Sequence, residues 1–386
     1  MTRRWAPAVL AAAGLALAAC GASGSGTTTS NAKPAPAASA DQNLAGTCPA
    51  TVVVQMAWTP EAEHGAIYHL VGPNYQIDAN RKRVTGPLVA GGRDTGVKIE
   101  VRAGGPAIGF QNAASQMYAD PDVMLGAVST DDAVGLSAKQ PVLAVMAPFD
   151  KAPYMLQWDP KQHPDFHSIV DIGKTKTTVL YFNGAMYMEY LIGSGILRRD
   201  QVDGSYDGSP ARWLSEGGKI VQQGFATNEP YVYGSVLPQW KKPVEFQLVH
   251  DTGYPIYPEA VVVRPDRKAQ YASCLKKLVP LIQRAQAEFV AGPGPTVDLI
   301  VKANEAFKGF PYPKEQALFS VEQQRKLGIV GNGGNATIGD FDPNRIKTVL
   351  DIVTPILSGQ RKEVKAGLTP ADLYTNEFID QSIGLK

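Results

Sequence analysis

Several kinds of sequence feature are missing from this chain, and each absence excludes a class of function. The 386 residues carry a formal net charge of only +1 and show no cluster of lysine and arginine, which argues against a nucleic-acid partner. Beyond residue 19, no hydrophobic run is long enough to span a bilayer. The sequence also lacks a Gly-x-Ser-x-Gly nucleophile motif and a phosphate-binding loop.

Patterns of metal ligands are equally scarce. His163 and His167 have the i, i+4 spacing of ligands on one helix face, but Pro164 stands between them and no acidic or cysteine partner completes a set. A solvated loop is the better interpretation of this pair. We therefore expect no metal, no other cofactor and no enzymatic activity.

The N-terminus has the features of an export signal. A cationic start at residues 2–4 precedes an apolar run over residues 6–19, which is too short to span a bilayer comfortably. The run ends in Leu-Ala-Ala-Cys-Gly at residues 17–21, which resembles the bacterial lipobox, where the chain is cut before a cysteine that is then lipidated. The alternative is an ordinary signal peptide with an incidental cysteine. The lipobox interpretation predicts a signal peptide over residues 1–19 and a protein anchored by Cys20 to the extracytoplasmic face of the cell membrane.

The stretch over residues 20–46 is dominated by Gly, Ala, Ser, Thr, Asn and Pro and shows no apolar periodicity. Such a composition cannot bury a core. It predicts a flexible tether between the membrane and the folded body.

The chain has only three cysteines. If Cys20 carries lipid, Cys48 and Cys274 remain as an even number in an oxidising compartment, and a disulfide is the expected pairing. The alternative is two buried free thiols. A bridge requires that the fold bring the chain back to its start, because the two residues are far apart in sequence.

The folded body alternates between strand and helix patterns, which predicts an α/β fold with mainly parallel sheets flanked by helices. A second strand–helix series begins near residue 169, so two lobes are expected. The predicted organisation is a first part of lobe 1 over 47–150, lobe 2 over 151–254, and a second part of lobe 1 with a helical C-terminal extension over 255–386. Ligands of open α/β sheets bind beyond the carboxyl ends of the strands, so we expect a small-molecule site between the lobes.

Five segments occur in the order of a known family. They are Trp-Thr-Pro-Glu-Ala-Glu-His-Gly-Ala-Ile-Tyr at 58–68, the strand and small polar turn at 123–134, Ile-Val-Asp-Ile-Gly-Lys at 169–174, Gln-Gly-Phe-Ala-Thr-Asn-Glu-Pro at 223–230, and Asp-Thr-Gly-Tyr-Pro-Ile-Tyr at 251–257, followed by a strand at 261–264. Together they resemble the solute-binding proteins of ABC importers, of the nitrate, sulfonate, taurine and thiamine-pyrimidine-precursor type. The resemblance covers roughly residues 52–290 and implies a two-lobed periplasmic-binding-protein-like type II fold. Three parts of the chain depart from the family pattern: an insertion at 74–92, the segment 206–210 and the long tail.

The strand ends supply candidate ligand-binding residues in lobe 1. His64 and Tyr68 would share one helix face, and Glu61 precedes them. The alternative is that Trp58 and Tyr68 are core residues and Glu61 a helix cap. Ser129, Thr130 and Asp131 follow the next strand and could contact a ligand; the alternative is that they only cap the helix that begins there. The lobe 1 candidates are Trp58, Glu61, His64, Tyr68, Ser129, Thr130 and Asp131.

Lobe 2 and its return crossing supply the remaining candidates. Glu229 precedes a proline and is held extended, so its carboxylate could project between the lobes, with a surface role as the alternative. Two tyrosines flank the presumed hinge and could stack on a ligand. The candidates are Asn183, Met186, Tyr187, Asn228, Glu229, Tyr231, Tyr254 and Tyr257.

The resemblance implies a monomeric receptor that captures a small organic solute, polar heteroaromatic or anionic, and delivers it to an ABC permease. The absence of a clear Arg or Lys among the strand-end candidates argues against nitrate or sulfonate. A receptor specific for a thiamine pyrimidine precursor is one alternative. An exported enzyme on the same fold is an alternative of another class.

Overall fold

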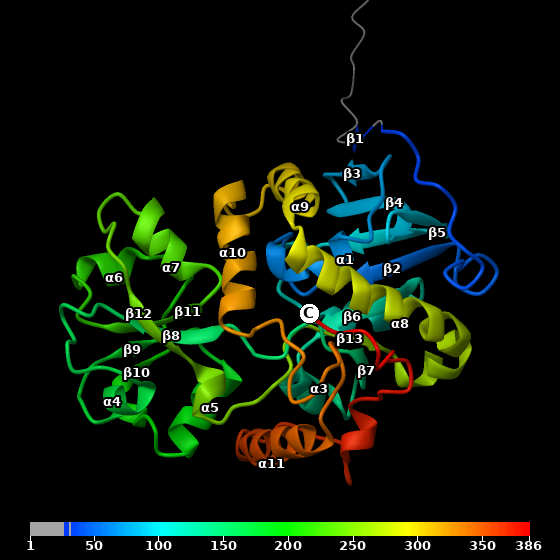
Figure 1. The fold of residues 1–386 in the computed structure, drawn as a ribbon. Helices are drawn as coiled ribbons and strands as arrows, with labels where there is room; N and C mark the ends of the chain where they lie inside the picture. The colour runs from blue at the N-terminus through cyan, green and yellow to red at the C-terminus, as the bar shows by residue number, and fades with distance from the viewer. Residues whose placement is uncertain (1–26, 31) are drawn as a thin grey trace, which may run out of the picture.

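The computed structural model describes residues 27–30 and 32–386, which form two sheets, each flanked by helices (Figure 1). The predicted α/β class and its two lobes are confirmed. The predicted signal peptide and Cys20 lie outside the described residues. Among the residues that are described, no helix is both long enough and apolar enough to cross a membrane.

Lobe 1 is built on the eight-stranded sheet, with the order β1-β3-β4-β5-β2-β6-β13-β7. Its centre is β2, whose valines are buried and which pairs in parallel with β5 and β6. β-Branched residues pack well on such a surface, which is why this run forms a central strand. The strands are β1 (Thr27–Thr29), β2 (Thr51–Gln55), β3 (Gln76–Asp78), β4 (Arg83–Ala90), β5 (Arg93–Arg102), β6 (Val123–Val128), β7 (Leu143–Met146) and β13 (Ala260–Val263).

Lobe 2 is built on the five-stranded sheet, with the order β10-β9-β11-β8-β12. The chain enters it before β8 and returns to the first sheet at β13. The strands are β8 (Tyr154–Trp158), β9 (Val179–Leu180), β10 (Val202–Asp203), β11 (Val221–Phe225) and β12 (Glu245–Leu248).

Both sheets are mixed rather than mainly parallel, which corrects the sequence prediction. In lobe 1 the departure at 74–92 forms β3 and β4, which pair antiparallel with each other, and β4 pairs antiparallel with β5. Gly91 and Gly92 join β4 to β5 with positive φ angles, the backbone that a tight hairpin turn requires. The crossing strands β8, β12 and β13 also run antiparallel to their neighbours.

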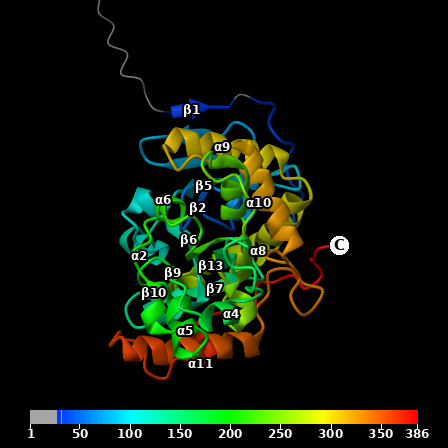
Figure 2. The same ribbon diagram turned by 90° about the vertical axis from the view of Figure 1, so that its left-hand side faces the viewer.

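Helices cover the sheets and link the lobes. They are α1 (Gly65–Tyr68), α2 (Ala113–Ala119), α3 (Thr130–Leu136), α4 (Ile169–Gly173), α5 (Met186–Gly193), α6 (Ala211–Ser215), α7 (Glu229–Tyr231), α8 (Lys268–Ala291), α9 (Gly294–Phe307), α10 (Lys314–Lys326) and α11 (Pro343–Gly359). The expected helical C-terminal extension contains α9, α10 and α11. α10 stands between the two sheets in Figure 1, and α11 lies along one end of the molecule in both views, where it packs against α3 of lobe 1 and α5 of lobe 2 (Figure 2).

The predicted disulfide between Cys48 and Cys274 is present, with an S–S distance of 1.98 Å and 4.8 Å between the Cα atoms. Cys48 precedes β2 and Cys274 lies in α8, so the bridge joins the start of lobe 1 to the helix that follows the return crossing. It fixes the two separated parts of lobe 1 to each other.

The flexible tether predicted over residues 20–46 is wrong for residues near the folded body. Leu44 is fully buried, and its backbone N–H donates to the carbonyl of Thr95. The N–H of Ala38 donates to the carbonyl of Asp94 on the same strand, and β1 pairs antiparallel with β3. One buried leucine and a series of backbone hydrogen bonds hold a segment whose composition alone indicates disorder.

Candidate ligand-binding site between the lobes

A buried histidine stands among carboxylates where the chain leaves β2. His64 is only 2% exposed, and its Nε2 lies 3.7 Å from a carboxylate oxygen of Glu259 and 4.0 Å from one of Glu61. Neither ring nitrogen has a hydrogen-bond partner among the described residues. Burial lowers the pKa of His64 to about 3, so the imidazole is neutral at physiological pH. A neutral imidazole offers one acceptor and one donor, and both are free here.

The carboxylates around His64 share a poorly hydrated environment. Burial and the neighbouring acids raise the pKa of Glu61 well above its usual range, although 27% of its side chain remains exposed. The same two causes raise the pKa of Glu259 to about 8. Glu63 accepts a hydrogen bond from Ser320 at 3.1 Å through one oxygen, while its other oxygen is buried without a partner. Like charges in one site disfavour ionisation, so this part of lobe 1 holds protons that a water-exposed cluster would release.

The end of β6 adds a second acidic group. Asp131 accepts a hydrogen bond from the hydroxyl of Tyr254 at 2.7 Å, while its other oxygen is buried and unpartnered. Burial raises the pKa of Asp131. Desolvation and the charge of Asp131 raise the pKa of Asp132 to about 7, although the residue itself is exposed to solvent. Ser129 lies next to Tyr154 of lobe 2. Thr130 accepts a hydrogen bond from the backbone N–H of Tyr257 at 3.0 Å and so fixes the return crossing.

Lobe 2 faces these acids with an aromatic wall. Tyr154, at the start of β8, has its ring centroid 5.4 Å from that of Tyr187 and 5.3 Å from that of Phe225. Burial raises the pKa of Tyr154, and Asp131, Asp132 and Glu259 of lobe 1 lie close enough to raise it further. The wall therefore lies opposite the carboxylates of lobe 1.

The polar groups of the lobe 2 wall are already engaged. Tyr187 donates a hydrogen bond of 2.6 Å to the side chain of Gln223. Glu229 accepts one of 2.6 Å from the backbone N–H of Phe225, and burial raises the pKa of this carboxyl group to about 7. Gly224 leaves the room that Glu229 fills, because a Cβ there would lie 2.9 Å from that carboxyl group. The charge of Glu63 also acts on Glu229, which places the two acids near each other across the lobes.

Helix α10 closes one side of the region between the lobes. Gln316 donates to the side-chain oxygen of Asn228 at 2.5 Å, and Phe319 lies with its ring centroid 5.5 Å from that of Tyr231. On the other side, the backbone N–H of Ala62 donates to the hydroxyl of Tyr312, just before α10. Asn228 and Tyr231 therefore contact α10 rather than an open space. Nothing in the local pattern of 314–326 indicates this position, because it depends on the packing of distant segments.

An aromatic cluster forms around Trp58, shortly after the end of β2 in lobe 1. Trp58 is partly buried and stacks on Phe310 with ring centroids 6.2 Å apart, and Phe110 lies 5.8 Å away. The two phenylalanines are 59% and 68% exposed. Trp58 thus reaches the surface at the end of β2 instead of lying wholly in the core.

Three expected site residues lie elsewhere, whereas a fourth, Tyr68, is close enough to Glu61 for that charge to add to the effect of burial in raising the pKa of Tyr68. Tyr68 is buried in the core of lobe 1, with its hydroxyl unpartnered. Tyr257 is covered by Phe341 and by Arg345, whose guanidinium lies 3.6 Å from the ring centroid. Met186 packs against the hydrophobic core and Asn183 is exposed. The structure does not bring Asn183, Met186 and Tyr257 to the carboxylates.

Five residues of the site were absent from the sequence prediction: Glu63, Asp132, Tyr154, Phe225 and Glu259. Glu63 and Asp132 stand next to predicted residues, and both are carboxylates at a strand end, so the same reasoning could have included them. No local pattern indicates Tyr154 or Glu259. They reach the site because the chain crosses between the sheets at both places. In the residues that the structure describes, no cluster of His, Cys, Asp and Glu has the arrangement of a metal site.

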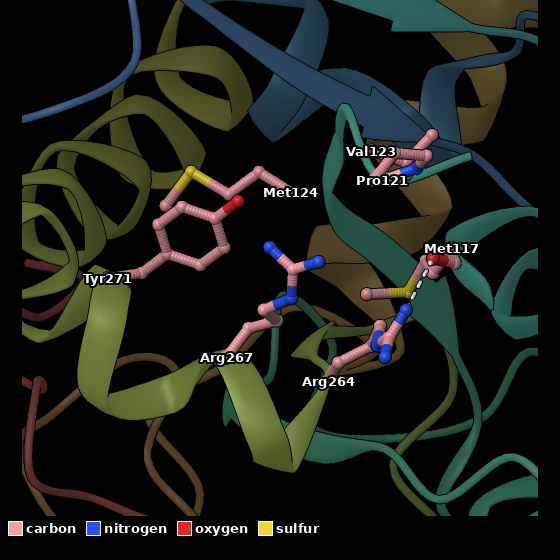
Figure 3. Close-up of a pocket in the computed structure, with 7 residues that line it drawn as sticks. All are labelled: Met117, Pro121, Val123, Met124, Arg264, Arg267 and Tyr271. Atoms are coloured by element: carbon pink, nitrogen blue, oxygen red, sulfur yellow. Dashed lines mark hydrogen bonds between the residues drawn. The ribbon is translucent and has the colours of Figure 1, made fainter.

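Two small hollows differ in position and chemistry. One lies in lobe 1 at the acidic group, where Glu63, His64 and Glu259 line it together with aliphatic side chains from β2, β6 and β13. The other lies on the outside of lobe 1 between Arg264, Arg267 and Tyr271 (Figure 3). Its Arg264 is already paired with Asp266 at 2.6 Å, and no predicted site residue lines it. The first hollow has room for about one water molecule and is lined by lobe 1 alone, so it marks the lobe 1 side of the candidate ligand site and not the whole of it.

The fold has solved relatives of low sequence similarity. The structure is similar to the periplasmic aliphatic sulphonate binding protein from Escherichia coli, at a TM-score of 0.51 and 10% identity over 88% of this chain and 94% of that one. It is also similar to the alkanesulfonate-binding protein from Xanthomonas axonopodis pv. citri bound to MOPS, with a TM-score of 0.51 and 9% sequence identity. That match covers 85% of this chain and 99% of the other. A third similar structure is the periplasmic sulfonate-binding protein of a sulfonate ABC transporter from Methylobacillus flagellatus KT, with a TM-score of 0.50 and 12% sequence identity. That match covers 85% of this chain and 92% of the other.

No protein-family model matches the sequence, and no curated protein matches it at a significant level. The identities to the solved structures are low, so the similarity establishes the fold and not the ligand. The chain has the fold of periplasmic solute-binding proteins of ABC importers.

Proposed function

We propose that this protein is the extracytoplasmic solute-binding component of an ABC importer. The observation that carries the proposal is the meeting, between the two lobes of this fold, of unpartnered polar groups from lobe 1 and an aromatic wall from lobe 2. Glu259 and Asp131 supply free acceptor atoms, and Tyr154 supplies the facing ring. A site divided between two lobes binds best when the lobes close on the ligand, so ligand contacts shift the population toward the closed state.

The solute in this proposal is small, organic and at least partly aromatic or heteroaromatic. Aromatic side chains offer large, rigid contact area, and the polar atoms opposite fix the orientation of a bound ring. The alternative of an anionic solute is not retained here, because the site presents several carboxylates and no basic side chain bonded to them. A thiamine pyrimidine precursor, with amino donors on a heteroaromatic ring, stays within the proposed class.

The remaining parts of the proposal concern the location. A lipid on Cys20 would hold the protein on the outer face of the cell membrane, as the lipobox predicts, and a monomer would deliver the closed form to a permease. We expect Cys20→Ala to release the protein from the membrane fraction without changing its folded structure. A variant that stays with the membrane after a high-salt wash would contradict lipidation at this residue.

A comparison of spent growth media separates the receptor from an exported enzyme on the same fold. The producing strain and a strain lacking this gene are grown in the same medium, and the small molecules left are measured by mass spectrometry. A receptor predicts that at least one solute stays in the medium of the deletion strain and is consumed again when the gene is restored. If no solute stays behind, or if a conversion product disappears instead, the receptor function is contradicted.

A further inference from the structure

We infer that the solute carries a positive charge with N–H donors, and that Glu61, Glu259 and His64 of lobe 1 bind the charged group. This inference rests on the proposed function and names the chemical class of its ligand. The neighbouring structures named for sulfonate binding concern a ligand of opposite charge, so the inference does not follow from the shared fold.

The charge balance between the lobes gives the first reason. Glu61, Glu63, Asp131, Asp132, Glu229 and Glu259 gather there. Among the ion pairs of the described residues, none joins a lysine or an arginine to any of the six, and Lys362 acts only at a distance on Asp132. Nearby bases are used elsewhere: Lys151 pairs with Asp251 and Arg345 with Asp150. Ionising several neighbouring carboxyl groups that are partly removed from water is costly without a counter-ion, and a bound cation would supply one.

The unpartnered atoms give the second reason, and they also indicate the kind of cation. Glu63, Asp131 and Glu259 each have one buried oxygen without a hydrogen-bond partner, and both ring nitrogens of buried His64 are free. Glu63, His64 and Glu259 line the same small hollow. Without a ligand these carboxyl groups tend to hold protons, because burial raises their pKa values, and a bound cation would favour their ionised form. Ionised carboxylates only accept hydrogen bonds, and a neutral imidazole can accept one as well as donate one. The missing partner is therefore a donor, which fits an ammonium, amidinium or protonated aminopyrimidine better than a quaternary ammonium.

The opposite wall is suited to the same class. Tyr154 faces the acids from lobe 2, with Phe225 packed edge-on against it, and the face of an aromatic ring attracts a cation. Tyr187 packs against Tyr154 and is itself held by a hydrogen bond to Gln223. Carboxylates on one side and rings on the other would enclose an organic cation when the lobes close.

Thermal melting of the full mature protein with charge-sorted probes tests the inference. The probes are primary amines, amidines and guanidines with aromatic or alkyl bodies, and each has a matched alcohol, sulfonate and quaternary ammonium of the same skeleton. We expect stabilisation by N–H-bearing cations, a weaker effect of the quaternary compounds, and none from alcohols or sulfonates. Stabilisation by sulfonates or alcohols, or by no cation at all, would overturn the inference. Sulfonate binding would leave the receptor function standing, whereas the medium comparison tests that function separately.

Two substitutions locate the charged group. In Glu61→Gln and Glu259→Gln, the affinity for the best cation should fall roughly ten- to hundredfold, the range for a hydrogen bond to a charged group. Glu245→Gln is the matched control, because Glu245 is exposed on β12 of lobe 2. Melting of each unliganded variant verifies that it is folded. Unchanged affinity in both site variants would place the cation elsewhere and overturn the assignment.

Discussion

At the candidate site, the polar side chains of the two lobes are partnered differently, although lobe 2 also holds unpartnered buried atoms elsewhere, on Gln157 and Trp213 for example. In lobe 1, His64, Asp131 and Glu259 keep buried atoms that have no hydrogen-bond partner. In lobe 2, Tyr187 and Glu229 have their facing polar atoms bonded within the lobe. A buried polar atom without a partner is costly, so lobe 1 gains more from a ligand than lobe 2 does. The difference indicates that lobe 1 selects the ligand and lobe 2 covers it.

The covalent link is a second difference, and removing it should give the largest effect. We expect Cys48→Ser with Cys274→Ser to destabilise lobe 1 by about 5 kcal/mol, the chain-entropy value for so long a closed loop. Hydrogen exchange followed by mass spectrometry should show faster exchange in β2, β5 and α8, with β8 and β11 of lobe 2 unchanged. Equal loss of protection in both lobes would show that they unfold as one unit. The disulfide would then not distinguish the stability of lobe 1 from that of lobe 2.

Placing a positive side chain among the carboxylates of lobe 1 should abolish binding of the cationic solute. In Glu259→Lys, the new ammonium can pair with Glu61 and Glu63, so we expect cation affinity to fall more than a hundredfold, beyond the loss of one charged hydrogen bond. Calorimetric titration measures the affinity, and Glu245→Lys on the outer strand is the control. Retained affinity in Glu259→Lys would show that lobe 1 does not hold the charge.

The raised pKa values of the acids predict how stability changes with pH. Burial raises the pKa of Glu259 to about 8 and that of Glu229 to about 7, whereas both groups ionise near 4.5 in an unfolded chain. Between pH 4.5 and 8 the folded protein binds more protons, so its stability falls as pH rises through this window.

The melting temperature of the unliganded protein should therefore drop from pH 5.5 to pH 8.5. It should drop less in Glu259→Gln, because that side chain no longer ionises. Binding of a cation that stays protonated should strengthen over the same range, since it favours the ionised carboxylates. A melting temperature that rises steadily to pH 8.5 in the wild type would contradict the raised pKa values of Glu259 and Glu229.

A substitution in the aromatic wall of lobe 2 should have the smallest effect on stability and on ligand affinity. Tyr187→Phe removes the hydrogen bond to Gln223 but keeps the ring, so we expect a loss of about 1 kcal/mol in stability and a change of a fewfold in ligand affinity. Chemical denaturation and calorimetry measure the two quantities. A loss of affinity as large as that of Glu259→Lys would show that lobe 2 selects the ligand as strongly as lobe 1.

Sequence reasoning succeeded where the signal is local and failed where it depends on distant packing. The valine-rich run of β2, the long α8 and the pairing of Cys48 with Cys274 could be predicted, because strand propensity, helical periodicity and an even cysteine count each leave a mark. The mixed sheets and the position of α10 could not, since antiparallel crossings and an inserted hairpin have no signature in the βα rhythm.

The candidate site divides in the same way. Glu61, His64, Asp131 and Glu229 follow strand ends and were predicted from that position, and the structure gathers them between the lobes. Glu259 shows the limit of this reasoning. It precedes β13 rather than following a strand, and it meets His64 only because the return crossing brings it there. The charge of the site therefore becomes apparent only when the segments are assembled.

The most direct test is to identify the solute that the protein carries. The protein is purified from its own exporting host, denatured, and the small molecules released are analysed by mass spectrometry in both ion polarities. We expect an organic molecule that is positively charged at neutral pH and bears N–H donors, in close to one copy per chain. A sulfonate, a nitrate or any other anion recovered at that ratio would contradict the assignment of the carboxylates of lobe 1.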